Sequence, residues 1–255
     1  FLPINYYKSL LSTKKDNYAV YAETAFEEEQ SLLLLGNDVS SRYTRRTPGE
    51  FEKIARYILK TGQAKQGNYM VFFPSYKMMQ QVYEVFWELN NDEMECIIQQ
   101  SGMKEEEREE FLGEFCRERG KTLIAFCVMG GIFGEGIDLK KEQLIGAIIV
   151  GTGIPQISNE REILMNYYDK RSGEGFDYAY RYPGMNKVLQ AAGRVIRTVE
   201  DIGVIELLDE RFMQSDYRKL FPKEWENRKS CSIDSVESYL EQFWKSKEMT
   251  GNELP

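Results

Sequence analysis

Short, largely apolar runs alternate with longer amphipathic segments along most of the chain. Six runs of strand length lie at 18–21, 32–35, 69–73, 122–126, 145–150 and 203–208. The runs at 69–73 and 145–150 are apolar throughout, as expected for strands that are buried on both faces. Strands that alternate with helical segments predict an α/β fold, with a parallel sheet covered by helices on both faces.

Helix signals fall between these runs. Thr47-Pro48-Gly49-Glu50 is a capping box with proline at the first helical position, so a helix should begin there and end near residue 60. Further helices are predicted at 76–89 and 236–244. We expect residues 1–230 to form the α/β domain, in which 1–46 supply the leading segment and first strands. Residues 231–255 should form a helix and tail.

Composition narrows the classes of function. The 255 residues are 42% hydrophobic and 29% charged, as in a globular protein, and no apolar run approaches the 18 residues of a membrane span. The absence of histidine excludes Ser-His triads and His metal sites. Four cysteines without a C-x-x-C pair argue against a zinc or redox site and favour a reducing compartment. We therefore expect a cytoplasmic protein with no membrane partner.

The strongest indication of function is the stretch 190–198, Gln-Ala-Ala-Gly-Arg-Val-Ile-Arg-Thr. If it is a helix, Gln190, Gly193, Arg194 and Arg197 share one arc and the opposite arc is apolar. Two guanidinium groups on one face suit phosphate oxygens. Because Gly193 has no side chain, the helix could approach a ligand closely at this position. The alternative is an amphipathic helix with two surface arginines.

The pattern Q-x-x-G-R-x-x-R, followed by the strand at 203–208, resembles the last motif of superfamily 2 helicases. The sequence QAAGRVIRT is similar to this motif in the XPD/DinG branch of DNA helicases. This resemblance implies a RecA-like second motor domain. It also implies that Arg194 and Arg197 reach the γ-phosphate of an ATP bound mainly, with Mg²⁺, by a different domain. Gln190 would orient the nucleotide or the attacking water.

Three other segments resemble motifs of the same family, in the expected order. Residues 1–11 resemble the segment that connects the first motor domain to the second, so we interpret the chain as part of a longer protein. Ser75 and Tyr76 begin a helix after a strand, as in helicase motif IV, which contacts DNA. Residues 130–139 resemble motif V, with Gly134 in place of the usual serine. The motif implies DNA contact by Glu135 and ATP contact by Gly136, Asp138 and, from the arginine stretch, Gly193.

A basic cluster at 40–46 places Arg42, Arg45 and Arg46 around Tyr43. The functional interpretation is a contact that follows the backbone of single-stranded DNA, with Tyr43 available for stacking. The alternative is a polar linker, because short basic clusters are common on protein surfaces.

No G-x-x-x-x-G-K-[ST] sequence is present; the glycines at 62 and 67 have the spacing, but Asn68 follows. We therefore expect ATP and Mg²⁺ to be held mainly by another domain, and no metal site in this chain. Leu207-Leu208-Asp209-Glu210 imitates a Walker B strand, but it follows the arginine stretch. Asp209 and Arg211 are instead expected to cap the next turn.

These observations favour the second motor domain of an ATP-dependent DNA helicase, with single-stranded DNA and the N-terminal motor domain of the same protein as partners. Two alternatives stay open. The first is a doubly wound α/β metabolic enzyme that binds a phosphorylated ligand in the glycine-rich loop at 130–136. The second is a non-catalytic RecA-like interaction domain. This alternative would be favoured if a carboxylate of the same chain paired with the arginines.

Overall fold

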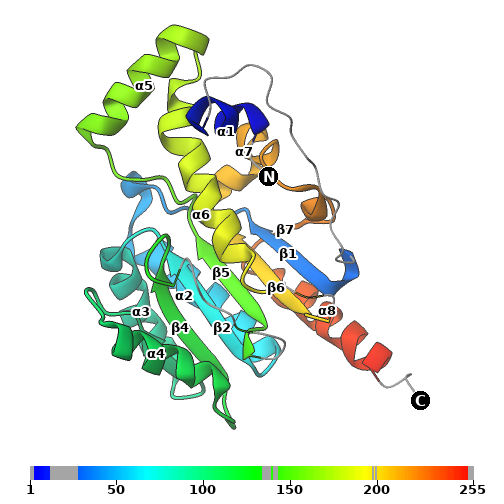
Figure 1. Ribbon diagram of the computed structural model, residues 1–255. Coiled ribbons are helices and arrows are strands. Elements are labelled where there is room, and N and C mark those ends of the chain that lie inside the picture. Colours follow the sequence, from blue (N-terminus) through cyan, green and yellow to red (C-terminus); the bar gives the residue numbers. More distant parts are fainter. Residues whose placement is uncertain are drawn as a thin grey trace.

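The computed structural model describes residues 3–11, 28–133, 139, 143–196, 198 and 200–251. Seven strands of this part of the chain form one sheet in the order β3-β4-β2-β5-β6-β1-β7, and every pair is parallel (Figure 1). The strands are β1 (Ser31–Gly36), β2 (Asn68–Phe73), β3 (Glu95–Ile98), β4 (Leu123–Val128), β5 (Gly146–Val150), β6 (Gly203–Leu208) and β7 (Lys229–Cys231). The predicted parallel α/β fold is confirmed. The strand predicted at 18–21 lies outside the described residues.

Helices cover both faces of the sheet, because alternate residues of each central strand point to opposite sides. On one face, Phe72 and Leu207 pack with α4 (Glu105–Gly113) and α6 (Tyr182–Ala192). On the other face, Phe73 and Leu208 pack with α2 (Pro48–Ala64), α3 (Tyr76–Asn90) and α8 (Val236–Gly251). β7 crosses the boundary predicted at residue 230, and α8 contributes to the same core as α2 and α3.

The local signals for α2 and α3 work as their sequences predict. The Thr47 hydroxyl accepts a hydrogen bond from the Glu50 amide at 3.3 Å, and Pro48 occupies the first turn of α2. The Ser75 hydroxyl accepts from the Met78 amide at 3.3 Å and caps α3 in the same way. Both helices therefore start at the carboxyl ends of strands, where their free amide groups are available to an anion.

Three helices lie beyond the carboxyl ends of the strands, at the top of Figure 1. They are α1 (Ile4–Leu11), α5 (Asn159–Ser172) and α7 (Ser215–Arg218). The Tyr6 ring of α1 lies 5.5 Å from the ring centre of Tyr178 and 5.0 Å from that of Tyr182. Aromatic packing thus attaches α1 to the start of α6.

The structure corrects the expected helix at 190–198. α6 ends at Ala192, and the amide groups of Arg194 and Val195 bond to carbonyls three residues earlier, at Ala191 and Ala192. Gly193 is the cap residue of α6. The chain turns there because Val195 is drawn into the core beside β6: a Cβ at Gly203 would lie 2.3 Å from Val195 Cγ1.

A buried carboxyl group lies at the centre of the sheet. Glu206 of β6 has no exposed surface, and its Oε1 lies 2.7 Å from the Thr61 hydroxyl. That hydroxyl also lies 2.8 Å from the Tyr57 carbonyl, which can only accept a proton. A hydroxyl has one proton to donate, so the contact with Glu206 needs the proton of the carboxyl group. Burial accordingly raises the pKa of Glu206 to about 8.

We expect Glu206→Gln to stabilise the protein at pH 8 by on the order of 2 to 4 kcal/mol. The unfolded carboxyl group ionises near pH 4.5, whereas the folded one keeps its proton to about pH 8. The free energy of unfolding should therefore fall between these pH values in the parent protein, and the glutamine removes that loss while its amide still donates to Thr61.

Urea unfolding at pH 5, 6.5 and 8 measures this effect. Glu237→Gln, on the exposed face of α8, is the matched control and should change stability by less than about 0.5 kcal/mol. A Glu206→Gln protein with the parent's pH dependence would contradict a neutral, buried Glu206.

Candidate functional site

The carboxyl ends of β1, β2, β5 and β6 meet at one edge of the sheet. Gly151, directly after β5, has φ of 86°, and a Cβ there would lie 2.3 Å from the Ser41 hydroxyl and 3.9 Å from the Pro74 ring. Only glycine allows this close approach without strain. It brings the loop after β1, with the arginine cluster, beside the loop after β2, with Ser75 and Tyr76.

A buried polar network fixes the loop after β1. Asp209, which follows β6 and has no exposed surface, accepts hydrogen bonds from the Ser41 amide at 2.9 Å and the Ser41 hydroxyl at 2.7 Å. Arg211 donates to both oxygens of Asp209 at 2.8 Å. Burial alone would raise the pKa of Asp209, but the hydrogen bonds and charge of Arg211 outweigh burial and lower it. The Arg211 amide also donates to Asp209 at 2.9 Å, so the predicted capping role is confirmed.

The arginine cluster is built on this network. The Arg46 guanidinium donates to the Ser41 carbonyl at 3.1 Å and lies 5.6 Å from the centre of the Tyr43 ring. Burial, and then the neighbouring charge of Arg211, lower the pKa of Arg46. The Tyr43 ring is 82% exposed. The cluster therefore combines an exposed aromatic face with concentrated positive charge.

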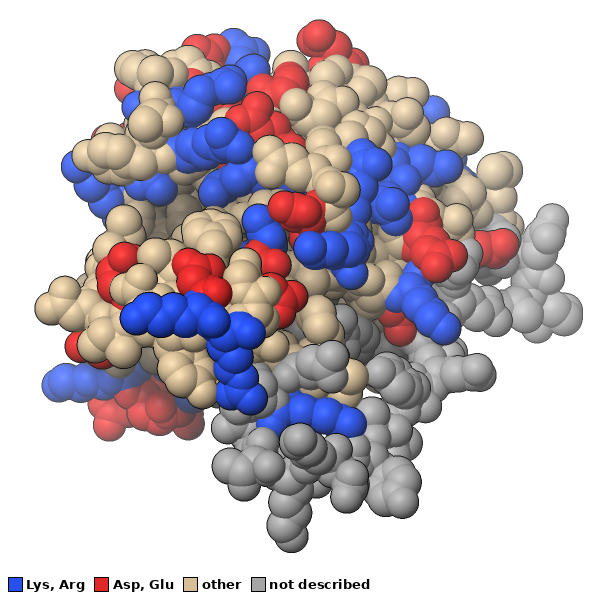
Figure 2. All heavy atoms as spheres, turned by 90° about the horizontal axis from the view of Figure 1, so that it is seen from above, with Lys and Arg blue, Asp and Glu red and all other residues tan. Residues whose placement is uncertain are grey.

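Long ion pairs balance the other two arginines among the described residues. Arg42 lies 3.7 Å and Arg45 3.5 Å from the partly exposed Glu210, and Arg45 lies 3.8 Å from the buried Glu50. Both guanidinium groups are themselves exposed, and the pairs with Glu210 contribute little, so an incoming phosphate can replace them. Figure 2, which looks down on the top of Figure 1, shows groups of Lys and Arg side chains gathered on this face, with carboxylates among them.

Ser75 and Tyr76 lie at the same edge. Tyr76 is partly exposed, and its hydroxyl accepts a hydrogen bond from the Gln99 side chain at 2.9 Å. The other end of the Gln99 amide accepts from the Val128 amide at 2.8 Å. Gln99 thus ties the Tyr76 ring to the end of β4, where the glycine-rich loop begins.

The glycine-rich loop begins against α6. Gly130 has φ of 69°, and a Cβ there would lie 3.0 Å from the Lys187 side chain. Burial, and then the charge of Arg161, lower the pKa of Lys187. The predicted contacts Glu135, Gly136 and Asp138 lie outside the described residues.

Three of the predicted nucleotide contacts, Gln190, Gly193 and Arg194, lie toward the far end of α6. Gly153 and Gly184 meet where α6 starts, at the carboxyl edge: a Cβ at Gly184 would lie 2.6 Å from the Thr152 carbonyl. The eleven residues of α6 span about 16 Å before Gly193 and Arg194. Gly193 is exposed, and Gln190 and Arg194 are partly exposed; Arg197 lies outside the described residues. The structure thus separates these residues from the arginine cluster.

The described residues hold no group of three Cys, Asp or Glu side chains placed to bind a metal ion. In the same residues, no helix combines the length and the apolar character of a membrane span.

A family model described as the helicase C-terminal domain matches residues 58–228, from within α2 to just before β7. The chain belongs to this family. The match includes the loop after β2, the glycine-rich loop and the arginine stretch, so it supports an XPD-like helicase C-terminal domain of superfamily 2.

Relatives of this helicase C-terminal domain are themselves helicases. The chain is 28% identical to the ATP-dependent DNA helicase XPD of Sulfolobus acidocaldarius over 189 residues, which are 72% of this chain and 32% of the relative. It is 27% identical to human regulator of telomere elongation helicase 1 over 207 residues, which are 73% of this chain and 17% of the relative. The chain thus spans about a third or less of these proteins.

Solved structures agree on the fold. An XPD helicase structure superposes with a TM-score of 0.65 at 24% identity and covers 79% of this chain and 35% of its own. The structure of S. cerevisiae Dbp5 L327V bound to RNA and ADP BeF3 superposes with a TM-score of 0.52 at 11% identity, over 95% of this chain and 51% of its own. The sheet is therefore that of a RecA-like helicase domain.

The sequence did not predict two of the contacts that position this site, those of Gln99 and of Ser41 with Asp209. Gln99 follows β3, which has no clear apolar run and was not predicted. The link between Ser41 and Asp209 joins residues 168 positions apart. The one local signal was the apolar run before Asp209, which indicated that this residue ends a strand and begins a turn.

Proposed function

We propose that the chain is the second motor domain of an ATP-dependent DNA helicase. Arg194 and Arg197 reach the γ-phosphate of ATP that the first motor domain binds with Mg²⁺, and Gln190 orients the nucleotide or the attacking water. A guanidinium group offers a planar pair of donors and a fixed charge to the phosphoryl group as negative charge develops on it. Gly136 and Asp138 would approach the same nucleotide.

The position of Arg194 carries this proposal. The arginine follows an exposed glycine at the end of α6, on the sheet face that the start of the glycine-rich loop also contacts. A second domain docked on this face would meet the partly exposed arginine side chain. The helicase relatives and the family match favour this reading over a metabolic enzyme with a phosphorylated ligand.

The same proposal places single-stranded DNA along the carboxyl edge. Ser75 and the first amides of α3 would receive one phosphate, and Arg42, Arg45 and Arg46 would receive its neighbours. Tyr43 is exposed enough to stack on a base. Glu135 of the glycine-rich loop would also contact the strand. Opening and closing of the two motor domains would then move the strand in steps.

We expect the chain to bind a single-stranded oligonucleotide weakly and to lose affinity as salt rises, because each phosphate contact releases counterions. Arg42→Ala and Arg46→Ala should each reduce the slope of log K against log salt by about 1. Fluorescence anisotropy at a series of salt concentrations measures both effects.

Arg56→Ala, an exposed arginine of α2 paired with Glu52, is the matched control and should leave binding unchanged. Affinity that does not depend on salt, or a preference for duplex DNA, would contradict the carboxyl edge as the DNA track.

A further inference from the structure

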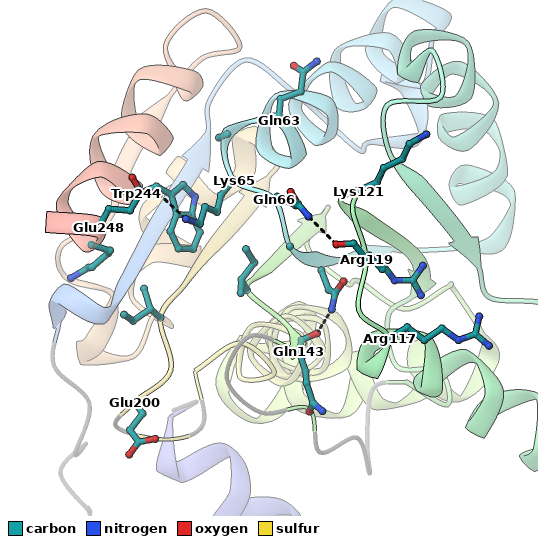
Figure 3. Close-up of a pocket in the computed structure, with 16 residues that line it drawn as sticks. Gln63, Lys65, Gln66, Arg117, Arg119, Lys121, Gln143, Glu200, Trp244 and Glu248 are labelled. Atoms are coloured by element: carbon teal, nitrogen blue, oxygen red, sulfur yellow. Dashed lines mark hydrogen bonds and ion pairs between the residues drawn. The ribbon is translucent and has the colours of Figure 1, made fainter. Parts of the chain in front are cut away.

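A groove of about 1360 Å³ runs along the amino ends of the strands, at the edge of the sheet opposite the arginine cluster. Its lining comes from the connection between α2 and β2, the segment before β4, the starts of β5 and β6, and α8. Figure 3 shows Arg117, Arg119 and Lys121 along one wall and Trp244 and Glu248 along the other, with Lys65 and Gln66 between them.

The charge of the groove is opposite to that of the whole chain. Five of its lining side chains are cationic and two are carboxylates, whereas the chain has a net charge of −8. Arg119 is almost buried and held by Glu95 and Glu114, so it supports the wall. Arg117 and Lys121 are exposed. Arg117 pairs with Glu114, whose side chain is mostly buried, and Lys121 pairs at 3.4 Å with the exposed Asp92, whose carbonyl oxygen also accepts a hydrogen bond from the ammonium. Exposed cations such as these can exchange a local partner for an incoming anion at little cost.

Trp244 provides a second, independent indication of a ligand. Its side chain lines the groove and is 7% exposed, and its indole N–H is buried without an acceptor among the described residues. A buried donor that makes no hydrogen bond costs free energy. The Lys65 ammonium lies 6.0 Å from the ring centre and 2.8 Å from Glu248, and both of these side chains reach the surface. Displacement of this pair would open the indole N–H to a carbonyl or carboxylate.

The lining fits a peptide better than a nucleic acid. Ile145 and Ile202 provide apolar surface for an aliphatic side chain, and the side-chain amides of Gln63 and Gln66 match the donors and acceptors of a peptide backbone. Trp244 is the one aromatic residue in the lining, and it is too buried to stack on a base. The exposed aromatic ring of the arginine cluster lies at the other edge of the sheet.

We propose that the amino-end groove binds an acidic peptide segment of a partner protein. Carboxylates of the peptide meet Arg117, Lys121 and Lys65, and one of its aliphatic side chains lies against Ile145, Ile202 and Trp244. Because the groove and the arginine cluster lie at opposite edges of the sheet, the partner binds while the carboxyl edge holds DNA.

The test is anisotropy of a labelled peptide of about twelve residues, rich in aspartate and with one isoleucine, added to the 255-residue chain. The Arg117→Glu/Lys121→Glu protein should bind roughly tenfold or more weakly. Trp244→Phe, which keeps an aromatic ring but loses the N–H, should bind about fivefold more weakly. Lys245→Glu, an exposed residue of α8 outside the groove, is the matched control and should bind as the parent does.

Three results would overturn the proposal. The first is equal affinity of the parent and the charge-reversed protein, with both shown to be folded by thermal melting. The second is equal affinity for a peptide with lysine in place of aspartate. The third is displacement of the peptide by a single-stranded oligonucleotide together with weaker peptide binding by Arg42→Ala, which would place the peptide at the carboxyl edge.

Discussion

In the complete protein, Arg194→Ala should lower the rate of ATP hydrolysis by roughly 10³-fold or more, because arginine fingers contribute about 10³ to 10⁵ in rate. The side chain follows the exposed Gly193 and is only partly buried, so its loss should lower the free energy of unfolding by no more than about 1 kcal/mol. DNA binding should change little, since the eleven residues of α6, which span about 16 Å, separate Arg194 from the carboxyl edge of the sheet. Steady-state hydrolysis and thermal melting of the same preparations measure these effects.

Related substitutions separate charge from geometry. Arg194→Lys should restore little activity, because an ammonium group keeps the charge but lacks the paired donors. Arg197→Ala should resemble Arg194→Ala, and Gln190→Ala should have a milder effect. Arg56→Ala is the matched control and should hydrolyse ATP as the parent does. If the Arg194→Ala protein melts many degrees lower while its folded fraction hydrolyses ATP normally, the arginine has a structural role.

Asp209→Ala should lower the free energy of unfolding by about 3 to 5 kcal/mol, which corresponds to a fall in Tm of roughly 6 to 20 °C. The substitution leaves Arg211 without the carboxylate that accepts three of its hydrogen bonds, and it removes the oxygen that accepts from both the amide and the hydroxyl of Ser41. The arginine cluster continues from that loop, so affinity for single-stranded DNA should also fall.

Glu210→Ala is the matched control for Asp209→Ala. Glu210 is the next residue, but it is partly exposed and lies 3.5 to 3.7 Å from Arg42 and Arg45, so its loss should cost less than about 1 kcal/mol. An Asp209→Ala protein as stable as Glu210→Ala would contradict a buried network as the support of the arginine cluster.

Apolar runs and capping residues predicted most of the central sheet and the helices beside it. The runs at 69–73, 145–150 and 203–208 became β2, β5 and β6, because strands buried on both faces have few polar positions. The edge strands β3 and β7 were missed. β7 has three residues, and only Cys231 is buried, so it lacks the pattern that marks a central strand.

The error at the arginine stretch has a specific cause. Helical spacing placed Ala192 and Val195 on the buried side and Gly193 on the exposed side, and the structure agrees with both. The same spacing cannot distinguish a continued helix from a tight turn after Gly193. The turn depends on the contact of Val195 with Gly203, which involves a strand whose position the periodicity does not give.

The candidate site was predictable only where it depends on local sequence signals. Ser75 follows a buried strand and caps a helix, and both signals are local. By contrast, the hydrogen bonds of Asp209 with Ser41 and of Gln99 with Tyr76 join distant segments. These contacts depend on the order of strands in the sheet, which hydrophobic periodicity does not predict.

The most direct test of the chain as a second motor domain is the rate of ATP hydrolysis by the isolated 255 residues, with and without single-stranded DNA. The sequence contains no phosphate loop, and the arginines act on a nucleotide that another domain binds, so we predict no turnover above background under either condition. Robust turnover that Arg194→Ala leaves unchanged would contradict the assignment.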